Sequence, residues 1–139
     1  MSRSVLVVDD DHETLDVTSA VLRNSGYRVF TASSGKEGIA SARRERPDLI
    51  LLDINMDDMD GWSALRLLRL DEETGSIPVA MFSIRYDLNE KMEALKRSAD
   101  DYIVKPFSID DLLDRVARLT ERGRGGAEPG SSAGETAWS

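Results

Sequence analysis

The fold of this chain is decided by residues 47–61, which read PDLILLDINMDDMDG. Four consecutive aliphatic residues, Leu49 to Leu52, are too few for a buried helix. They are typical of a central strand in a parallel sheet that is covered on both faces. The strand ends on a carboxylate, Asp53, at the sheet edge where ligands of open α/β proteins bind. Asp53 is therefore the first candidate for a reacting group.

Length and composition limit what the chain can be. Its 139 residues are enough for one compact domain with a hydrophobic core. The 26 acidic and 18 basic residues give a net charge of -8, which argues against direct nucleic-acid binding. The absence of cysteine excludes disulfides, thiolate metal sites and thiol nucleophiles. Because we find no membrane-span pattern and no signal-peptide pattern, we expect a soluble, cytoplasmic protein.

Short apolar runs alternate with helical patterns along the chain. We expect strands at Val5–Val8, Tyr27–Thr31, Leu49–Asp53, Ile77–Ser83 and Tyr102–Val104. We expect helices over about His12–Ser25, Gly35–Glu45, Trp62–Leu70, Asp87–Arg97 and Ser108–Arg122. Gly26 is placed to end the first helix in a left-handed conformation, and Ser108 with Asp111 matches a capping box. This alternation predicts an α/β fold with five parallel strands and helices on both faces of the sheet.

Polar side chains lie at the ends of four predicted strands: Asp9 and Asp10, Asp53, Ser83 and Lys105. Because parallel strands end at the same edge, we expect these groups to meet there. A cluster of carboxylates without histidine or cysteine indicates a hard divalent cation, namely Mg²⁺. A lysine and a hydroxyl beside such a cation form a binding set for a phosphoryl group. A carboxylate in this setting can attack phosphorus and become an acyl phosphate.

These motifs resemble the receiver domain of two-component response regulators, including single-domain regulators of the chemotaxis type, over about residues 3–122. The resemblance depends on four motifs in this order along the chain: VVDD at residues 7–10, Asp53 followed by Met56 and Asp60-Gly61, Ser83, and YIVKPF at residues 102–107. Together they are highly specific. The resemblance implies a flavodoxin-like, doubly wound (βα)5 fold with strand order 2-1-3-4-5.

The resemblance also implies a role for each acidic residue. Asp53 is expected to accept a phosphoryl group from a histidine kinase or a phosphotransfer protein, in an Mg²⁺-dependent reaction. Asp10 is expected to bind the metal directly, and Asp9 directly or through water. Asp53 itself and the main-chain carbonyl of Asn55 would complete the protein ligands.

Three further residues receive roles by the same resemblance. Lys105 would pair with the phosphoryl oxygens, Ser83 would hydrogen-bond one of them, and the Lys105–Pro106 peptide is expected to be cis. Ser83 and Tyr102 would form the switch, although Tyr102 can also be read as a half-buried ring with a solvated hydroxyl. Trp62, in the first turn of its helix, is interpreted as a packing residue.

Signalling is expected to occur by phosphorylation-dependent contact with a downstream protein. The implied contact face combines the fourth helix, the fifth strand and the fifth helix, on a monomer or a phosphorylation-dependent dimer, without direct contact to nucleic acid or membrane. The chain would catalyse only its own phosphoryl transfer and slow autodephosphorylation, so it is not expected to be an enzyme. Residues 1–122 form the expected domain, and the Gly- and Ser-rich residues 123–139 a disordered tail. The chain is then a stand-alone regulator or a fragment of a longer protein.

A phosphatase of the haloacid dehalogenase type is a rival interpretation. Those enzymes use a strand-end aspartate with a second aspartate two residues on, which Asp9 and Asp11 could imitate. Their final acidic pair should follow the lysine, whereas Asp100-Asp101 precedes Lys105, and Asp53 would have no role. The site of modification, Asp53 or Asp9, separates the two interpretations.

A pseudo-receiver that only docks other proteins is a second alternative, because the loop departs from the family pattern. Asp57 stands where proline is usual, and Asp58 follows it. Two extra carboxylates should help to recruit a cation and hinder an incoming phosphate. Ile84 replaces a small residue after Ser83 and could narrow access to Asp53.

Overall fold

The computed structural model of the chain describes residues 2–83 and 98–124. In order, its elements are β1 (Ser4–Val8), α1 (His12–Asn24), β2 (Arg28–Ala32), α2 (Gly35–Glu45), β3 (Leu49–Asp53), α3 (Gly61–Leu70), β4 (Val79–Ser83), β5 (Asp101–Val104) and α5 (Ile109–Arg124). The helix expected at Asp87–Arg97, the residue Ile84 and residues 125–139 of the expected tail lie outside the described residues.

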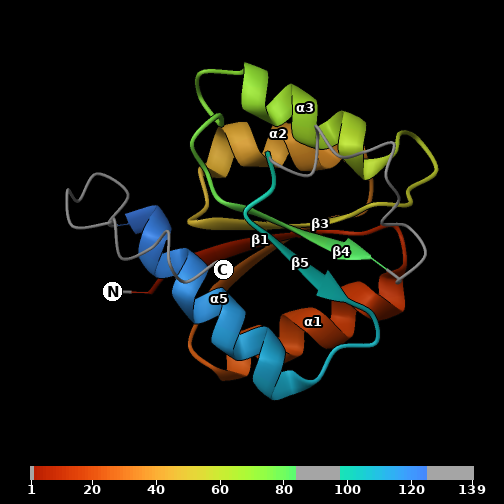
Figure 1. The fold of residues 1–139 in the computed structure, drawn as a ribbon. Coiled ribbons are helices and arrows are strands. Elements are labelled where there is room, and N and C mark those ends of the chain that lie inside the picture. The colour runs from red at the N-terminus through yellow and green to blue at the C-terminus, as the bar shows by residue number, and fades with distance from the viewer. Residues whose placement is uncertain (1, 84–97, 125–139) are drawn as a thin grey trace.

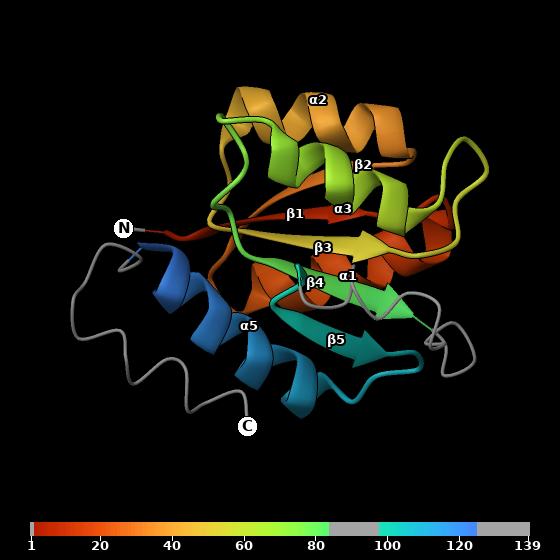
Figure 2. The ribbon, with the colours of Figure 1, turned by 45° about the horizontal axis from the view of Figure 1, so that its top comes forward.

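The five strands form one parallel sheet with the order β2-β1-β3-β4-β5, which confirms the predicted fold class. Helices α2 and α3 cover one face of this sheet, and α1 and α5 cover the other (Figures 1 and 2). Side chains of successive strand residues alternate between the two faces. Leu52 and Met81 therefore belong to the cluster under α2 and α3, and Leu51 and Phe82 to the cluster under α1 and α5.

Two strands begin later than the apolar pattern predicts, and both shifts have a backbone cause. After α1, Gly26 has a φ of 96°, and its N–H donates to the Arg23 carbonyl at 3.0 Å. The Tyr27 N–H donates to the Leu22 carbonyl at 3.1 Å, which completes a Schellman cap. Tyr27 thus belongs to the helix end, and β2 starts at Arg28. The prediction that Gly26 ends the first helix in a left-handed conformation is confirmed.

The second shift concerns β4. The Ile77 N–H donates to the Thr74 carbonyl at 3.1 Å, so Ile77 still belongs to the preceding turn. Pro78 has no N–H to donate, and the strand begins at Val79. At the last helix, the Ser108 hydroxyl accepts from the Asp111 N–H at 3.0 Å, as a helix cap does. The Asp111 carboxylate accepts from the Arg115 side chain.

Within residues 2–83 and 98–124, no helix is both long enough and apolar enough to cross a membrane.

Arg69 joins three segments at the amino-terminal edge of the sheet. From α3, its guanidinium donates to the carbonyls of Gly75 at 3.2 Å, Ile77 at 2.7 Å and Ser98 at 2.9 Å. It also pairs with the Asp100 carboxylate at 2.8 Å, and that carboxylate accepts from the Val79 N–H. The Arg69 side chain therefore connects the loop before β4 to the loop before β5.

We predict that Arg69→Ala lowers the free energy of unfolding by about 2–3 kcal/mol, because it leaves several shielded acceptors without a donor. The matched control is Arg43→Ala, which removes an exposed ion pair to Asp71 and should cost less than about 1 kcal/mol. Urea denaturation of both variants measures the difference. Equal losses would show that Arg69 does not clamp the two loops.

Candidate functional site

Three charged side chains meet on one side of the sheet at its carboxyl-terminal edge. Asp9 follows β1, Asp53 ends β3 and Lys105 follows β5. Each lies two residues after a member of the hydrophobic cluster under α1 and α5, namely Val7, Leu51 and Ile103. Strand alternation therefore directs the three side chains to the same side. The structure thus brings together three of the predicted strand-end side chains, Asp9, Asp53 and Lys105.

The Lys105 ammonium lies between two carboxylates. Its Nζ donates to Asp9 Oδ2 at 2.8 Å and to Asp53 Oδ1 at 3.0 Å. Asp9 is 1% exposed and Asp53 is 6% exposed, so both carboxylates are largely removed from water. The same Nζ lies 5.6 Å from the centre of the Phe82 ring. The Lys105–Pro106 peptide is cis, as expected.

Asp10 joins the two buried carboxylates. Asp9, Asp10 and Asp53 each offer one carboxylate oxygen, and these oxygens all lie within 4.8 Å of one another. The main chain orients two of the three, because Asp9 Oδ1 accepts from the Asp11 N–H at 3.0 Å and Asp10 Oδ2 from the Asp57 N–H at 2.9 Å. Hard oxygen ligands at this spacing fit Mg²⁺.

The electrostatics of this acidic cluster favour an added cation. Burial raises the pKa of Asp53 to about 6; Lys105 opposes this shift, and the charges of Asp9 and Asp10 add to it. Burial works against the charge of Lys105, but its hydrogen bonds to Asp9 and Asp53 outweigh burial and raise its pKa. Lys105 thus stays cationic at neutral pH. One ammonium faces three carboxylates, so the cluster keeps an excess of negative charge.

Gly61 allows α3 to begin directly on the end of β3. Its N–H donates to the Ile54 carbonyl at 2.6 Å. A Cβ at this position would lie 2.2 Å from the Asp53 carbonyl oxygen and 2.7 Å from the Ile54 Cα, so only glycine fits. Asp60 caps the same helix by accepting from the Ser63 N–H at 2.8 Å. The Asp60-Gly61 motif therefore fixes α3 against the backbone of Asp53.

The expectation that Asp57 and Asp58 both act beside the acidic cluster is wrong for Asp58. Its carboxylate accepts from the N–H groups of Gly35 and Lys36, both at 2.9 Å, at the start of α2. These bonds lower the pKa of Asp58. The helix N-terminus attracts the anion because its first N–H groups lack partners within the helix. Asn55, whose carbonyl was expected to bind metal, lies exposed in the same loop.

The two expected switch residues lie on neighbouring strands. Ser83 ends β4, where it is paired in register with Val104; its side chain lies outside the described part of the structure. Tyr102 lies in β5 and packs against the cluster under α2 and α3, on the face opposite the Asp53 carboxylate. Its ring centre is 6.2 Å from that of Trp62, with the planes inclined by 50°. Trp62 is a core residue, as predicted. Its contact with Tyr102 was not predicted.

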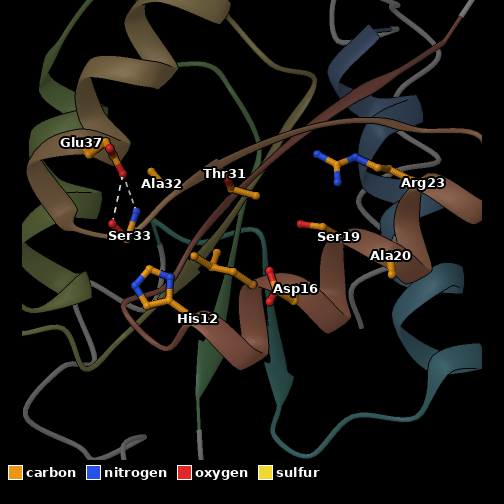
Figure 3. A pocket seen from close by; sticks show the side chains of 10 residues that line it. His12, Asp16, Ser19, Ala20, Arg23, Thr31, Ala32, Ser33 and Glu37 are labelled. Atoms are coloured by element: carbon orange, nitrogen blue, oxygen red, sulfur yellow. Dashed lines mark hydrogen bonds between the residues drawn. The ribbon is translucent and has the colours of Figure 1, made fainter.

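A separate pocket of about 400 Å³ lies between α1 and the end of β2. Figure 3 shows the side chains that line it. The pocket carries both signs of charge, with Asp16 and Glu37 as acids and Arg23 as a base. His12, the single histidine of the chain, is the first residue of α1 and lines this pocket. None of the residues that line the pocket belongs to the acidic cluster.

Curated relatives of the chain are transcriptional regulators of greater length. The transcriptional regulatory protein PrrA of Mycobacterium tuberculosis is 43% identical over 131 residues, which are 94% of this chain and 55% of that protein. The chain spans about half the length of the curated relatives it matches.

Solved structures of the same architecture agree with the sequence matches. CheY4 of Vibrio cholerae has a TM-score of 0.77 at 30% identity, covering 86% of this chain and 99% of that one. The receiver domain of the sensor histidine kinase PA1611 of Pseudomonas aeruginosa, solved with magnesium in its active-site cleft, has a TM-score of 0.78 at 30% identity, covering 87% and 99%.

A family model described as the response regulator receiver domain matches residues 5–117. This match contradicts the phosphatase interpretation, in which Asp9 is the reacting group and Asp53 has no role. The strand order and the acidic cluster agree with this match. The chain belongs to the response regulator receiver domain family.

Proposed function

We propose that the chain is a phosphoacceptor of a two-component system, and that Asp53 receives the phosphoryl group. The observation that carries this proposal is the position of Asp53, which is 6% exposed and 3.0 Å from the Lys105 ammonium. A buried carboxylate beside a fixed cation and two further carboxylates is arranged to react with a polyanion rather than to be solvated.

In the proposed reaction, an Asp53 oxygen attacks the phosphorus of a phosphohistidine. The O–P bond forms as the P–N bond breaks, and the donor imidazole leaves with the electron pair. Lys105 stays in place and offers its charge to the phosphoryl oxygens. Asp9, Asp10 and Asp53, with the Asn55 carbonyl, would hold Mg²⁺, which supplies further positive charge as the transferred group develops negative charge. Magnesium in the PA1611 receiver domain supports this assignment.

The donor has an apolar surface to dock on beside the site. A groove of about 550 Å³ between α1 and the segment after β5 is lined by Lys105, Pro106 and Phe107. At its rim, Val17 is 51% exposed and Ile109 is 54% exposed. Large apolar side chains left in water next to a reactive group favour contact with another protein. In this proposal, the histidine kinase or phosphotransfer protein covers this groove during transfer.

The readout is proposed to follow from the charge added at Asp53. A phosphoryl group carries about two negative charges and three acceptor oxygens, and it replaces the single charge of the Asp53 carboxylate, so the net gain is about one negative charge. Ser83 would move to satisfy one oxygen, and Tyr102 would turn into the space released. The fourth helix, β5 and α5 would then present a changed face to a downstream protein or a second copy. The fourth helix lies outside the described residues.

A docking pseudo-receiver is the second candidate, because Asp57 departs from the family pattern and lies exposed in the loop. Its N–H orients Asp10, which is a contribution of the backbone and not of the carboxylate. The second departure, Ile84, lies outside the described residues. Labelling of the protein decides between the two candidates.

A small-molecule phosphodonor with Mg²⁺ should add one phosphoryl group to the chain, detected as a mass increase of the intact protein. Asp53→Asn should abolish this labelling, and Asp10→Ala should reduce it strongly because a metal ligand is lost. The matched control is Asp57→Asn, which removes a neighbouring carboxylate but keeps the N–H that orients Asp10. Normal labelling of the Asp53→Asn protein would contradict the assignment.

Without a divalent cation, Asp53 should destabilise the fold at neutral pH. Its folded pKa of about 6 lies above the usual 3.8, so the folded state binds more protons than the unfolded state between these values. Stability therefore falls as pH rises from about 4 to about 6, by about 3 kcal/mol at most.

In metal-free buffer, Asp53→Asn should be more stable than the unaltered chain above pH 6, and the two should converge near pH 4. Urea denaturation across this pH range measures both curves. Millimolar Mg²⁺ should then raise the melting temperature of the unaltered chain, and less so that of Asp10→Ala, because a ligand that binds only the folded state stabilises it. A pH-independent difference between the curves would contradict the shifted pKa.

A further inference from the structure

An aromatic pair connects α3 to β5 on the face of the sheet opposite the Asp53 carboxylate. The Trp62 and Tyr102 ring centres are 6.2 Å apart, and their planes are inclined by 50°. Trp62 is 3% exposed, whereas Tyr102 is only partly buried. Tilted rings at this separation attract each other beyond the burial of their surface. The orientation of the Tyr102 ring therefore depends in part on Trp62.

Trp62 is also fixed to the backbone of the reacting residue. It follows Gly61, whose N–H donates to the Ile54 carbonyl at 2.6 Å. The space at Gly61 is so small that an added Cβ would lie 2.2 Å from the Asp53 carbonyl oxygen. Helix α3 and the end of β3 are thus in direct contact. A backbone shift at Asp53 must be accommodated by the first turn of α3, where Trp62 lies.

Residues on both sides of Tyr102 bond to neighbouring elements. Lys105, three residues on, bonds Asp53, and Asp101, one residue before, pairs with Arg115 at 2.6 Å. The Tyr102 N–H donates to the Asp101 carboxylate at 2.7 Å. With the strand tied at both ends and paired along β4, we expect a response at Tyr102 to be a motion of its side chain.

We propose that Trp62 is a positioning residue for Tyr102. It holds the tyrosine ring in its half-buried orientation over the cluster under α2 and α3, and it conveys backbone changes at Asp53 to that ring through the first turn of α3. This route crosses from one face of the sheet to the other without using the Ser83 side chain. The inference rests on the proposed phosphorylation of Asp53, after which the Tyr102 ring would turn further inward with Trp62 still packed against it.

Fluorescence can follow the pair directly, because the chain has only two tryptophans, Trp62 and Trp138. In the full chain with Trp138→Phe, emission comes from Trp62 alone. Beryllofluoride with Mg²⁺, which mimics the phosphorylated carboxylate, should shift this emission. Tyr102→Leu in the same background should remove most of the shift.

The affinity of the protein for beryllofluoride distinguishes a positioning role of Trp62 from a general packing role. Trp62→Leu should weaken it about two- to tenfold, the effect of losing one aromatic pair. Trp62→Phe should restore most of it, and Trp62→Leu should have no further effect in a Tyr102→Leu background. The matched control is Leu68→Val in the same helix and cluster, which should lower stability but leave the affinity unchanged.

Amide signals of Asp9, Asp10 and Asp53 distinguish the two ways of failing. If these amide signals do not respond to beryllofluoride and Mg²⁺, both the proposed function and the role of Trp62 are contradicted. If they respond while Trp62 emission and the affinity of Trp62→Leu stay unchanged, only the role of Trp62 is overturned. Equal weakening by Leu68→Val would also overturn it, because any loss of packing would then have the same effect.

Discussion

The site depends on one ammonium group held between two buried carboxylates. Lys105 reaches Asp9 at 2.8 Å and Asp53 at 3.0 Å, with the Asp10 carboxylate close by. A single cation cannot neutralise three anions, and burial makes the remaining charge costly. The groups are nevertheless close together because parallel strands end at the same edge of the sheet. Strand alternation directs Asp9, Asp53 and Lys105 to the same side. Burial, with smaller contributions from the charges of Asp9 and Asp10, raises the pKa of Asp53, and the excess negative charge is the reason for the proposed need for Mg²⁺.

Much of this arrangement could be predicted from sequence, because a parallel sheet turns strand ends into neighbours. Strands buried on both faces are apolar throughout, so the strand Leu49–Asp53 was located to the residue. Asp58 could not be placed, because its partners, the N–H groups of Gly35 and Lys36, belong to a distant helix start. The same holds for Trp62: its helical position predicts burial, but which ring it meets depends on how α3 lies over β5.

The two faces of the sheet have different proposed roles. The face under α1 and α5 carries the Asp53 and Lys105 side chains, and the apolar groove beside them suits a phosphodonor protein. The opposite face carries Tyr102 and the aromatic contact to Trp62. The proposed chemistry and the proposed readout are thus separated by one layer of backbone. Close contact between Gly61 and the Asp53 carbonyl is a physical connection across that layer.

In the proposed function, Asp53 is the group that binds a phosphoryl ligand, with a cation held by its acidic neighbours. Fluorine NMR of beryllofluoride tests this directly, since bound and free fluorines give separate signals. We expect bound signals that require Mg²⁺ and are absent from Asp53→Asn. Bound signals that persist in Asp53→Asn, or their absence from the unaltered chain at saturating Mg²⁺, would contradict it.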